Sequence, residues 1–399
     1  MTPKLAIFGE APAFDQPLYV GRPYVGDRKR LLDRIEGALD RVWLTNAGPL
    51  CDEFEQRVCD IIGVKHCVAM CNGTVALEIA ARALGLTGEV IVPSFTFIAT
   101  AHALQWQEIT PVFCDIDPET HNLDPVQVER MITPRTSGIV GVHVWGRPCA
   151  IEPLREVADR HGLRLMFDAA HAFACSHGGR MLGGFGDVEV FSFHATKFMN
   201  TFEGGSVVTN DDEIAIAMRY MRNFGFAGED DVRYLGTNGK LNEISAAMGL
   251  TSLDAIDDVV ARNRENMDTY HRVLGRLPGL ALIDYDRSEH NNYQYVVLEV
   301  DEAAAGLTRN ELTQVLHAEN VKARRYFHPG CHQMEPYRSL FPHAGLLLPH
   351  TERLTDRVMV LPTGMEIDAG TIERIAHIVE TAIAHAPEVR AGLALQEDA

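Results

Sequence analysis

Short apolar runs recur along the chain, and each is followed by a segment with helical periodicity. We predict that five of these runs form buried strands: 66-HCVAM-70, 89-EVIVP-93, 111-PVFCDI-116, 138-GIVGVHV-144 and 163-LRLMF-167. Helices are predicted between them, for example over 74–86, 98–106 and 151–162. Continuous apolar strands that alternate with helices are typical of a parallel sheet buried on both faces. The pattern therefore predicts an α/β fold with a mostly parallel sheet.

The chain has 399 residues, which exceeds one ordinary core and suggests two domains. Helical periodicity over 242–277, with an expected interruption at Gly249, would carry the chain out of the first domain. We predict a large domain at 1–254 and a smaller α+β domain at 255–399, and the segment 1–25 could pack on the smaller one. Three elements are predicted in the smaller domain: a strand at 293–300, a helix after Thr308 and a final helix at 371–386.

Composition limits the classes of partner. The formal net charge is −19, which argues against nucleic acid because its binding needs a basic face. No apolar run reaches the roughly 20 residues of a membrane helix, and the first residues lack the apolar segment of a signal peptide. The eight cysteines form no CxxC pair. We therefore expect free thiols, a cytoplasmic location, no membrane partner and no metal site.

A candidate anion site lies in 71-CNGTVAL-77, where a predicted strand ends and a helix begins. The free amides at a helix N-terminus suit a phosphate, Gly73 would allow close approach, and the Thr74 hydroxyl could add a bond. An ordinary turn capped by Asn72 or Thr74 stays open at this point. The glycine-rich fingerprints GxGxxG and GxxxxGK[ST] are both missing from the sequence.

A candidate acid lies at the end of the strand predicted over 163–167. Asp168 follows this strand directly, at the edge where open α/β sheets bind ligands. A buried carboxylate needs a cationic partner, and a protonated pyridine nitrogen would serve. His171 could reach a substituent of the same ring. A helix-capping aspartate and a core histidine are the alternatives.

The segment 190-VFSFHATKFMNTFEGGSVVTN-210 places a single lysine, Lys197, after an apolar strand. Ser192 and His194 flank the end of that strand. A desolvated lysine is a neutral amine and therefore a nucleophile, whereas a surface lysine in a glycine-rich loop is the alternative. A phosphate site, an acid for a ring nitrogen and a reactive lysine are together the parts that hold pyridoxal 5'-phosphate. Phe97 could stack on its ring or belong to the core.

These segments resemble those of a known family. The order LTNAGPL, CNGTVAL, PSFTFIAT, VHVWG, FDAAHAF, FSFHATKFMNTFEGG and LGTNGKLNEISAAMGL is similar to the DegT/StrS sugar aminotransferases. The resemblance spans residues 20 to 385 and implies the fold of fold-type-I pyridoxal-phosphate enzymes, with a large α/β/α domain. The motif 323-ARRYFHPGCHQMEPY-337 is similar to the viosamine-type enzymes, which aminate C4 of a dTDP-4-keto-6-deoxyhexose.

The resemblance also implies roles for single residues. Lys197 would bind the cofactor covalently, Asp168 would pair with its pyridine nitrogen, Phe97 would stack on its ring, and His171 would hydrogen-bond the ring hydroxyl. The phosphate would be held by Gly73, Thr74, Ser192 and, from a neighbouring subunit, Asn238, which implies a homodimer with shared sites. Lys240, Arg324, Tyr326 and His328 are candidates for the substrate side, where Arg and Lys would favour a diphosphate. A solvated basic patch is the alternative for these four.

The expected reaction moves an amino group from L-glutamate to C4 of dTDP-4-keto-6-deoxy-D-glucose, giving dTDP-4-amino-4,6-dideoxy-D-glucose. One branch of the family replaces the lysine by histidine and becomes a dehydratase, but this chain has Lys197 at that position. A C3 aminotransferase of a dTDP-3-keto-6-deoxyhexose and a non-catalytic protein that binds a nucleotide sugar are the alternatives. A free keto-inositol is disfavoured because it offers no diphosphate to the arginines.

Overall fold

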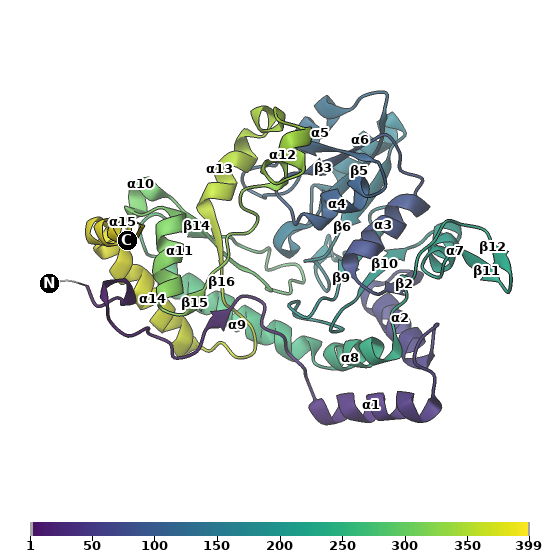
Figure 1. Ribbon diagram of the computed structural model, residues 1–399, viewed down its shortest axis with the longest axis horizontal. Helices are drawn as coiled ribbons and strands as arrows, with labels where there is room; N and C mark the ends of the chain where they lie inside the picture. The colour runs from purple at the N-terminus through teal and green to yellow at the C-terminus, as the bar shows by residue number, and fades with distance from the viewer. Residues whose placement is uncertain (1–2, 398–399) are drawn as a thin grey trace.

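A seven-stranded sheet forms the centre of the protein in the computed structural model, which describes residues 3–397 (Figure 1). The strand order is β2-β10-β9-β6-β5-β3-β4. The strands are β2 (His66–Met70), β3 (Glu89–Pro93), β4 (Thr110–Cys114), β5 (Thr136–Val142), β6 (Arg164–Asp168), β9 (Val188–Ser192) and β10 (Gly205–Thr209). Only β10 pairs antiparallel, with β2 and β9. The mostly parallel α/β sheet is therefore confirmed.

Helices cover both faces of this sheet, as the apolar runs predicted. The helices are α2 (Pro49–Ile62), α3 (Gly73–Ala83), α4 (Ala99–Gln105), α5 (Pro125–Met131), α6 (Ile151–His161), α7 (Asp212–Met221) and α8 (Glu243–Asp254). Within β3, Ile91 belongs to the apolar cluster that contains Phe54 of α2, whereas Val90 and Val92 belong to the cluster with Ala80 of α3. Successive strand residues therefore enter cores on opposite faces.

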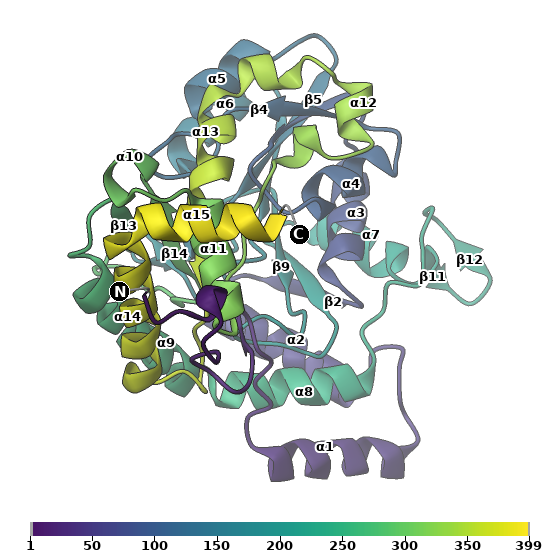
Figure 2. The ribbon, with the colours of Figure 1, turned by 60° about the vertical axis from the view of Figure 1, so that its left-hand side comes forward.

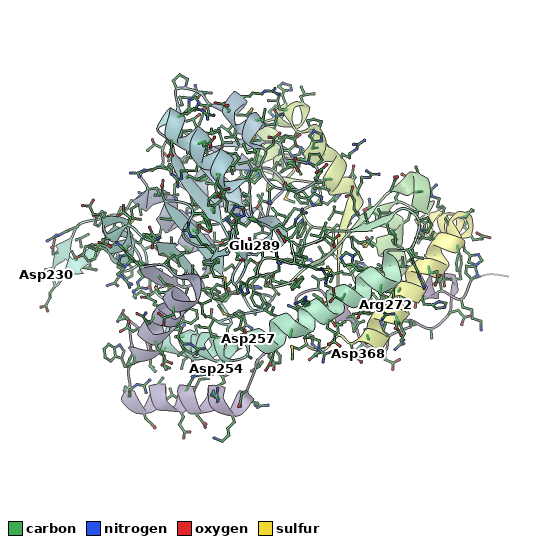
Figure 3. The ribbon with its side chains drawn as sticks, turned by 180° about the vertical axis from the view of Figure 1, so that it is seen from behind. Asp230, Asp254, Asp257, Arg272, Glu289 and Asp368 are labelled. Atoms are coloured by element: carbon green, nitrogen blue, oxygen red, sulfur yellow. The ribbon has the colours of Figure 1, made fainter. Side chains whose placement is uncertain are left out.

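The long helix predicted over 242–277 is interrupted, but not at Gly249. It ends at Asp254, and α9 (Ile256–Leu274) continues after Ala255; Figure 3 labels Asp254 and Asp257 at this junction. Gly249 lies inside α8, where an added Cβ would come within 2.6 Å of a Phe54 ring carbon. The glycine is thus explained by the close approach of α2 and α8, and the expected position of the break was wrong.

A second unit follows α9 and is built on three antiparallel strands, β13 (Leu280–Leu282), β14 (Val296–Val300) and β16 (Val358–Leu361). Its helices are α10 (Glu302–Ala305), α11 (Arg309–Ala318), α14 (Ala369–Ala384) and α15 (Ala386–Glu397). Thr308 and Glu311 form a capping box at the start of α11. The helix predicted after Thr308 is present, and the domain boundary at residue 254 stays a prediction.

The N-terminal segment packs on this second unit. β1 (Leu18–Tyr19) pairs in parallel with β15 (Val321–Lys322), and Leu5 and Ile7 share an apolar cluster with Leu312 of α11. Figure 2 shows the N-terminal turn η1 (Ala6–Phe8) in front of α11 and next to α15.

Residues after β15 return to the large sheet. α12 (Tyr337–Leu340) contributes Tyr337 to the apolar cluster of α3 and α4, and Asp115, at the end of β4, accepts the first-turn amides of His350 and Thr351 in α13 (Pro349–Arg357). The remaining elements are α1 (Arg28–Arg41), the hairpins β7 (Ser176–His177) with β8 (Arg180–Met181) and β11 (Phe226–Gly228) with β12 (Asp231–Val232), and the short helical turns η2 (Val144–Gly146), η3 (Cys331–Gln333) and η4 (Ala344–Leu347).

All eight cysteines are free thiols, and six of them are buried. Across residues 3–397 we find no helix with the length and apolar character needed to cross a bilayer.

Candidate active site

A cavity of about 340 Å³ opens at the carboxyl ends of β6 and β9 and at the start of α3. Its lining contains nine of the residues that the sequence predicted: Gly73, Thr74, Phe97, Asp168, His171, Ser192, Lys197, Arg324 and Tyr326. These residues come from segments that are far apart in the chain, and the carboxyl edge of the sheet is where such folds bind ligands. The cavity is therefore the candidate active site.

The start of α3 forms one end of the cavity. The Asn72 side chain accepts the Val75 amide at 2.8 Å and caps the helix, so the amides of Gly73 and Thr74 lie in the first turn, where a helix offers them no acceptor. A Cβ added to Gly73 would lie 3.2 Å from Ser192 Cβ and 3.4 Å from its Oγ. The space that glycine leaves between the helix start and the serine suits an anion. Cap and anion site, which the sequence left as alternatives, are both compatible with this geometry.

Asp168 ends β6 at the floor of the cavity and is buried. Its carboxylate accepts the Thr100 hydroxyl at 2.8 Å and the Ala170 amide at 3.1 Å. Burial nevertheless raises the pKa of Asp168 above its usual value. No ion pair joins Asp168 to another group in the described part of the chain, so a cationic group on a ligand would complete its environment.

His171 lines the same cavity and lies in a cage of aromatic rings. Its ring centroid is 4.4 Å from that of Tyr295, and its Nδ1 accepts the Trp145 amide at 3.3 Å. Burial lowers the pKa of His171 well below its usual value, and the nearby Lys197 charge acts in the same direction. A neutral imidazole that accepts at Nδ1 carries its proton on Nε2, so His171 can donate one hydrogen bond to a ligand.

Lys197 follows β9 and extends its amine into the cavity. Nζ donates to the Tyr295 hydroxyl at 3.2 Å. Burial lowers the pKa of Lys197 to about 8, although the nearby Tyr326 and Asp168 oppose the shift. A substantial fraction of the amine is therefore neutral at physiological pH, which is what a nucleophilic lysine requires.

Three predicted residues lie outside the lining of this cavity. The Lys240 amine donates to Asn223 at 3.0 Å, and His328 Nδ1 lies 3.5 Å from an Asp356 carboxylate oxygen. Asn238 is exposed and pairs by its backbone with Asn223. The structure thus does not bring these residues to the chain's own cavity, and their roles stay predictions. Phe97 does line the cavity, and 58% of the residue is exposed.

Several residues in or near the cavity were given no role from the sequence. Tyr295, which contacts the lysine amine, lies in a predicted strand, and only its tertiary contacts distinguish it from a core tyrosine. Thr100 supplies the hydroxyl to Asp168 from 68 positions away. His194 and Glu203 line the cavity and lie 3.4 Å apart, and both flank Lys197 in the segment from which it was predicted. Proximity to the lysine in sequence was the available signal for this pair.

The sheet, the second unit and the residues gathered at the carboxyl edge define a fold-type-I transferase of the pyridoxal-phosphate-dependent class. A profile of the DegT/DnrJ/EryC1/StrS aminotransferase family matches residues 26–380, and the chain belongs to this family. The predicted fold class, the resemblance and the assignment as an aminotransferase are confirmed.

Individual relatives agree with this assignment. The chain is 32% identical over 368 residues to dTDP-4-amino-4,6-dideoxy-D-glucose transaminase of Escherichia coli, covering 92% of this chain and 98% of the relative. A crystal structure of DesI in the presence of its TDP-sugar product is 55% identical, with a TM-score of 0.94 and coverage of 97% and 98%. The Helicobacter pylori aminotransferase PseC, involved in the biosynthesis of pseudoaminic acid, is 27% identical, with a TM-score of 0.85 and coverage of 92% and 100%.

Proposed function

We propose that the protein transfers an amino group from L-glutamate to C4 of dTDP-4-keto-6-deoxy-D-glucose, giving dTDP-4-amino-4,6-dideoxy-D-glucose. One observation carries the chemistry: a lysine amine with a pKa of about 8 shares a cavity with a buried carboxylate and a free helix start. The names of the Escherichia coli relative and of the DesI structure support a thymidine-diphosphate sugar. A cytoplasmic location stays a prediction.

The residues present fit pyridoxal 5'-phosphate. The first-turn amides of Gly73 and Thr74, together with Ser192, would hold the phosphate, in the space that a side chain at position 73 would fill. Asp168 would pair with the protonated ring nitrogen, which supplies the cation that its buried carboxylate lacks. When bound, the cofactor acts as an electron sink for the carbanion formed at the amino acid Cα.

Lys197 would perform both the covalent attachment and the proton transfer. As a free amine in the cavity, Nζ can take the proton from Cα of the amino donor and return a proton when the second substrate reacts. The Tyr295 hydroxyl, 3.2 Å from Nζ, orients the amine. The low pKa of Lys197 keeps a neutral fraction available for this role near neutral pH.

The sugar nucleotide would enter beside Arg324 and Tyr326. The Arg324 guanidinium lies over the Tyr326 ring, 4.8 Å from its centroid, and is exposed at the cavity. An exposed guanidinium held on a ring face can bind a diphosphate in a bidentate manner. Lys240 and His328 lie farther off and have weaker support for a place on the substrate side.

We further propose that the active unit is a homodimer with shared sites. Asn238 is exposed outside its own cavity, next to the hairpin of β11 and β12, which projects from the body of the molecule (Figure 1). Apolar side chains around this hairpin are exposed, including Leu235 at 72% and Phe224 at 48%. A second subunit would cover them and accept Asn238 at its phosphate.

The test uses the purified protein with pyridoxal phosphate. Borohydride reduction should fix the chromophore on the peptide that contains Lys197, and Lys197→Ala should lose both the fixation and the glutamate half-reaction. Lys65→Ala, which changes an exposed lysine near Asp212, is the matched control and should retain both. A Lys197→Ala protein with an undiminished half-reaction would overturn the proposal.

The sugar product decides the position of amination. NMR of the product from dTDP-4-keto-6-deoxyglucose and glutamate should show nitrogen on C4. A protein that leaves this sugar unchanged but converts the 3-keto isomer into a product with nitrogen on C3 would belong to the C3 aminotransferases. Binding of the sugar nucleotide by a colourless protein without turnover would instead indicate a non-catalytic relative.

A further inference from the structure

A serine, a histidine and a glutamate form a hydrogen-bonded chain next to the cavity. Ser94 Oγ lies 2.7 Å from His332 Nδ1, and His332 Nε2 lies 2.7 Å from Glu352 Oε1. Ser94 is fully buried, and His332 is 3% exposed. Glu352 also accepts the Gln333 amide at 2.8 Å. None of the three residues lines the cavity.

The same order of groups, serine to histidine to carboxylate, occurs in hydrolases, but here the serine cannot serve as a nucleophile. No substrate reaches a hydroxyl that is completely buried, and Ser94 Oγ also accepts the backbone amide of His332 at 3.1 Å. Both ring nitrogens of His332 are occupied by Ser94 and Glu352. The chain of bonds therefore holds backbone segments in place.

The segments that it joins are two walls of the cavity. Ser94 follows β3 and leads to Phe97, whereas His332 follows the loop that carries Arg324 and Tyr326. Further bonds run between the same segments. Cys331 donates its amide to the Ser94 carbonyl at 3.0 Å and its thiol to the Thr96 carbonyl at 3.3 Å. Ser94 and His332 are 238 positions apart, so this link is purely tertiary.

Packed aromatic rings extend the contact between these two segments toward the cavity. The Phe95 and Phe327 rings meet edge to face with centroids 5.3 Å apart, and Phe327 stacks on Tyr326 at 5.3 Å. Phe327 itself lines the cavity. A shift of the loop at His332 is therefore transmitted through packed rings to the two side chains that face the substrate.

We propose that His332, held between Ser94 and Glu352, is a positioning residue that fixes the loop 324–333 against the segment 94–97. It thereby sets Arg324 and Tyr326 relative to Phe97 and determines the affinity for the nucleotide sugar. The inference rests on the proposed function in one respect, namely that Arg324 and Tyr326 face the nucleotide sugar. It gives the histidine an indirect part in sugar binding and none in the glutamate half-reaction.

The variant Glu352→Gln tests the proposal because it keeps the length and an acceptor oxygen but removes the charge that holds His332. Glu152→Gln is the matched control, since Glu152 contacts the ring Nε2 of His177 at 3.1 Å on the exposed side of the molecule. In Glu352→Gln, we expect KM for the keto-sugar to rise at least about fivefold, the lower end of typical coupling between sites. The glutamate half-reaction should stay within about twofold of the wild-type rate, and the control should change neither.

Ser94→Ala provides an independent variant, because it removes the hydroxyl at the other end of the same imidazole. If both residues act through His332, the double variant should lose less sugar affinity than the sum of the single losses. Calorimetric titration with dTDP alone measures nucleotide binding at the same loop without turnover, and the Kd for dTDP should rise in parallel with the KM for the keto-sugar. A wild-type enzyme without aminotransferase activity would refute the proposed function, whereas the dTDP titration would still decide the inference.

A purely structural role predicts a different result. Each variant would then melt earlier, while KM and the Kd for dTDP would match those of the wild type and of Glu152→Gln. That pattern, or additive effects in the double variant, would overturn the proposal.

Discussion

Replacing Gly73 by alanine probes the proposed phosphate site at the point where space is smallest. In the middle of a helix, alanine is more stable than glycine by about 0.5–1 kcal/mol, and Gly73 is the first residue of α3. Here the new Cβ would lie 3.2 Å from Ser192 Cβ and 3.4 Å from Ser192 Oγ. The serine can shift by a few tenths of an ångström, so we expect the folded protein to remain stable. The methyl group would, however, occupy the space between the two phosphate-binding groups.

The magnitude follows from the bonds at risk. A hydrogen bond to a charged group contributes about 1.5–3 kcal/mol, and loss of one such bond to the phosphate corresponds to an increase of about 10- to 150-fold in Kd. The assay is a titration of cofactor-free protein with pyridoxal phosphate, followed by absorbance, together with thermal unfolding of the same samples. We expect a weaker cofactor affinity without a large change in melting temperature.

Gly370→Ala is the matched control because Gly370 also lies in the first turn of a helix, α14, and its added Cβ would meet only Asp368 Oδ1, at 3.7 Å. It should leave the cofactor affinity unchanged. An affinity for pyridoxal phosphate in Gly73→Ala that equals that of the control would refute the placement of the phosphate between Gly73 and Ser192.

Three further outcomes are expected. Asp168→Asn should slow the glutamate half-reaction on the order of 100-fold, because pairing with an opposite charge shifts the pKa of the cofactor ring nitrogen by about 1–3 units and the amide lacks that charge. Stopped-flow absorbance measures the rate of this half-reaction, and a near wild-type rate would contradict the expectation. Burial lowers the pKa of Lys197 from 10.5 to about 8 in the folded state, so at this group the unfolded state binds more protons between these values, and Lys197 should contribute a gain in stability as the pH rises through this window. The buried thiols, whose pKa burial raises, act in the opposite direction, so the contribution of Lys197 is the difference between the wild type and a variant without the amine. Urea unfolding at pH 7.5 and 9.5 checks this: the free energy of unfolding should change more favourably in the wild type than in Lys197→Met, and an equal change in both would argue against it. Gly249→Ala, with its Cβ 2.6 Å from the Phe54 ring, should lower the free energy of unfolding by about 1–3 kcal/mol through overpacking; an unchanged urea midpoint would show that α8 can move away.

The sequence sufficed for the strands of the sheet because burial on both faces requires continuous apolar residues. The strand predicted at 89–93 is β3 without a change, and the one predicted at 163–167 is β6 shifted by one residue. The break between α8 and α9 was predicted at the wrong residue. A glycine inside a helical pattern can mark either a break or a close approach, and only the position of Phe54 distinguishes the two.

In the candidate site, too, the sequence could predict only residues that a local pattern marks. Gly73, Asp168 and Ser192 could be predicted because each lies at the end of a strand or the start of a helix, and Lys197 because it follows the strand that ends at Ser192. The local pattern there already indicates the edge of the sheet. Tyr295 could not be predicted, since it lies 98 positions from the lysine amine that it contacts. The Ser94–His332 contact is a still longer link, and no local pattern marks either residue.

The direction of β10 explains why the phosphate site lies next to the lysine. β10 runs antiparallel to both of its neighbours, so β2 and β9 point the same way and end at the same edge of the sheet. Gly205 opposes Met70 on one side and Ser192 on the other, which brings the start of α3 beside the serine. A Cβ on Gly205 would lie 2.7 Å from the Gly73 amide nitrogen. The second glycine of the pair at 204–205 is thus required by the approach of the strand to the helix start, and the reversed strand makes the site possible.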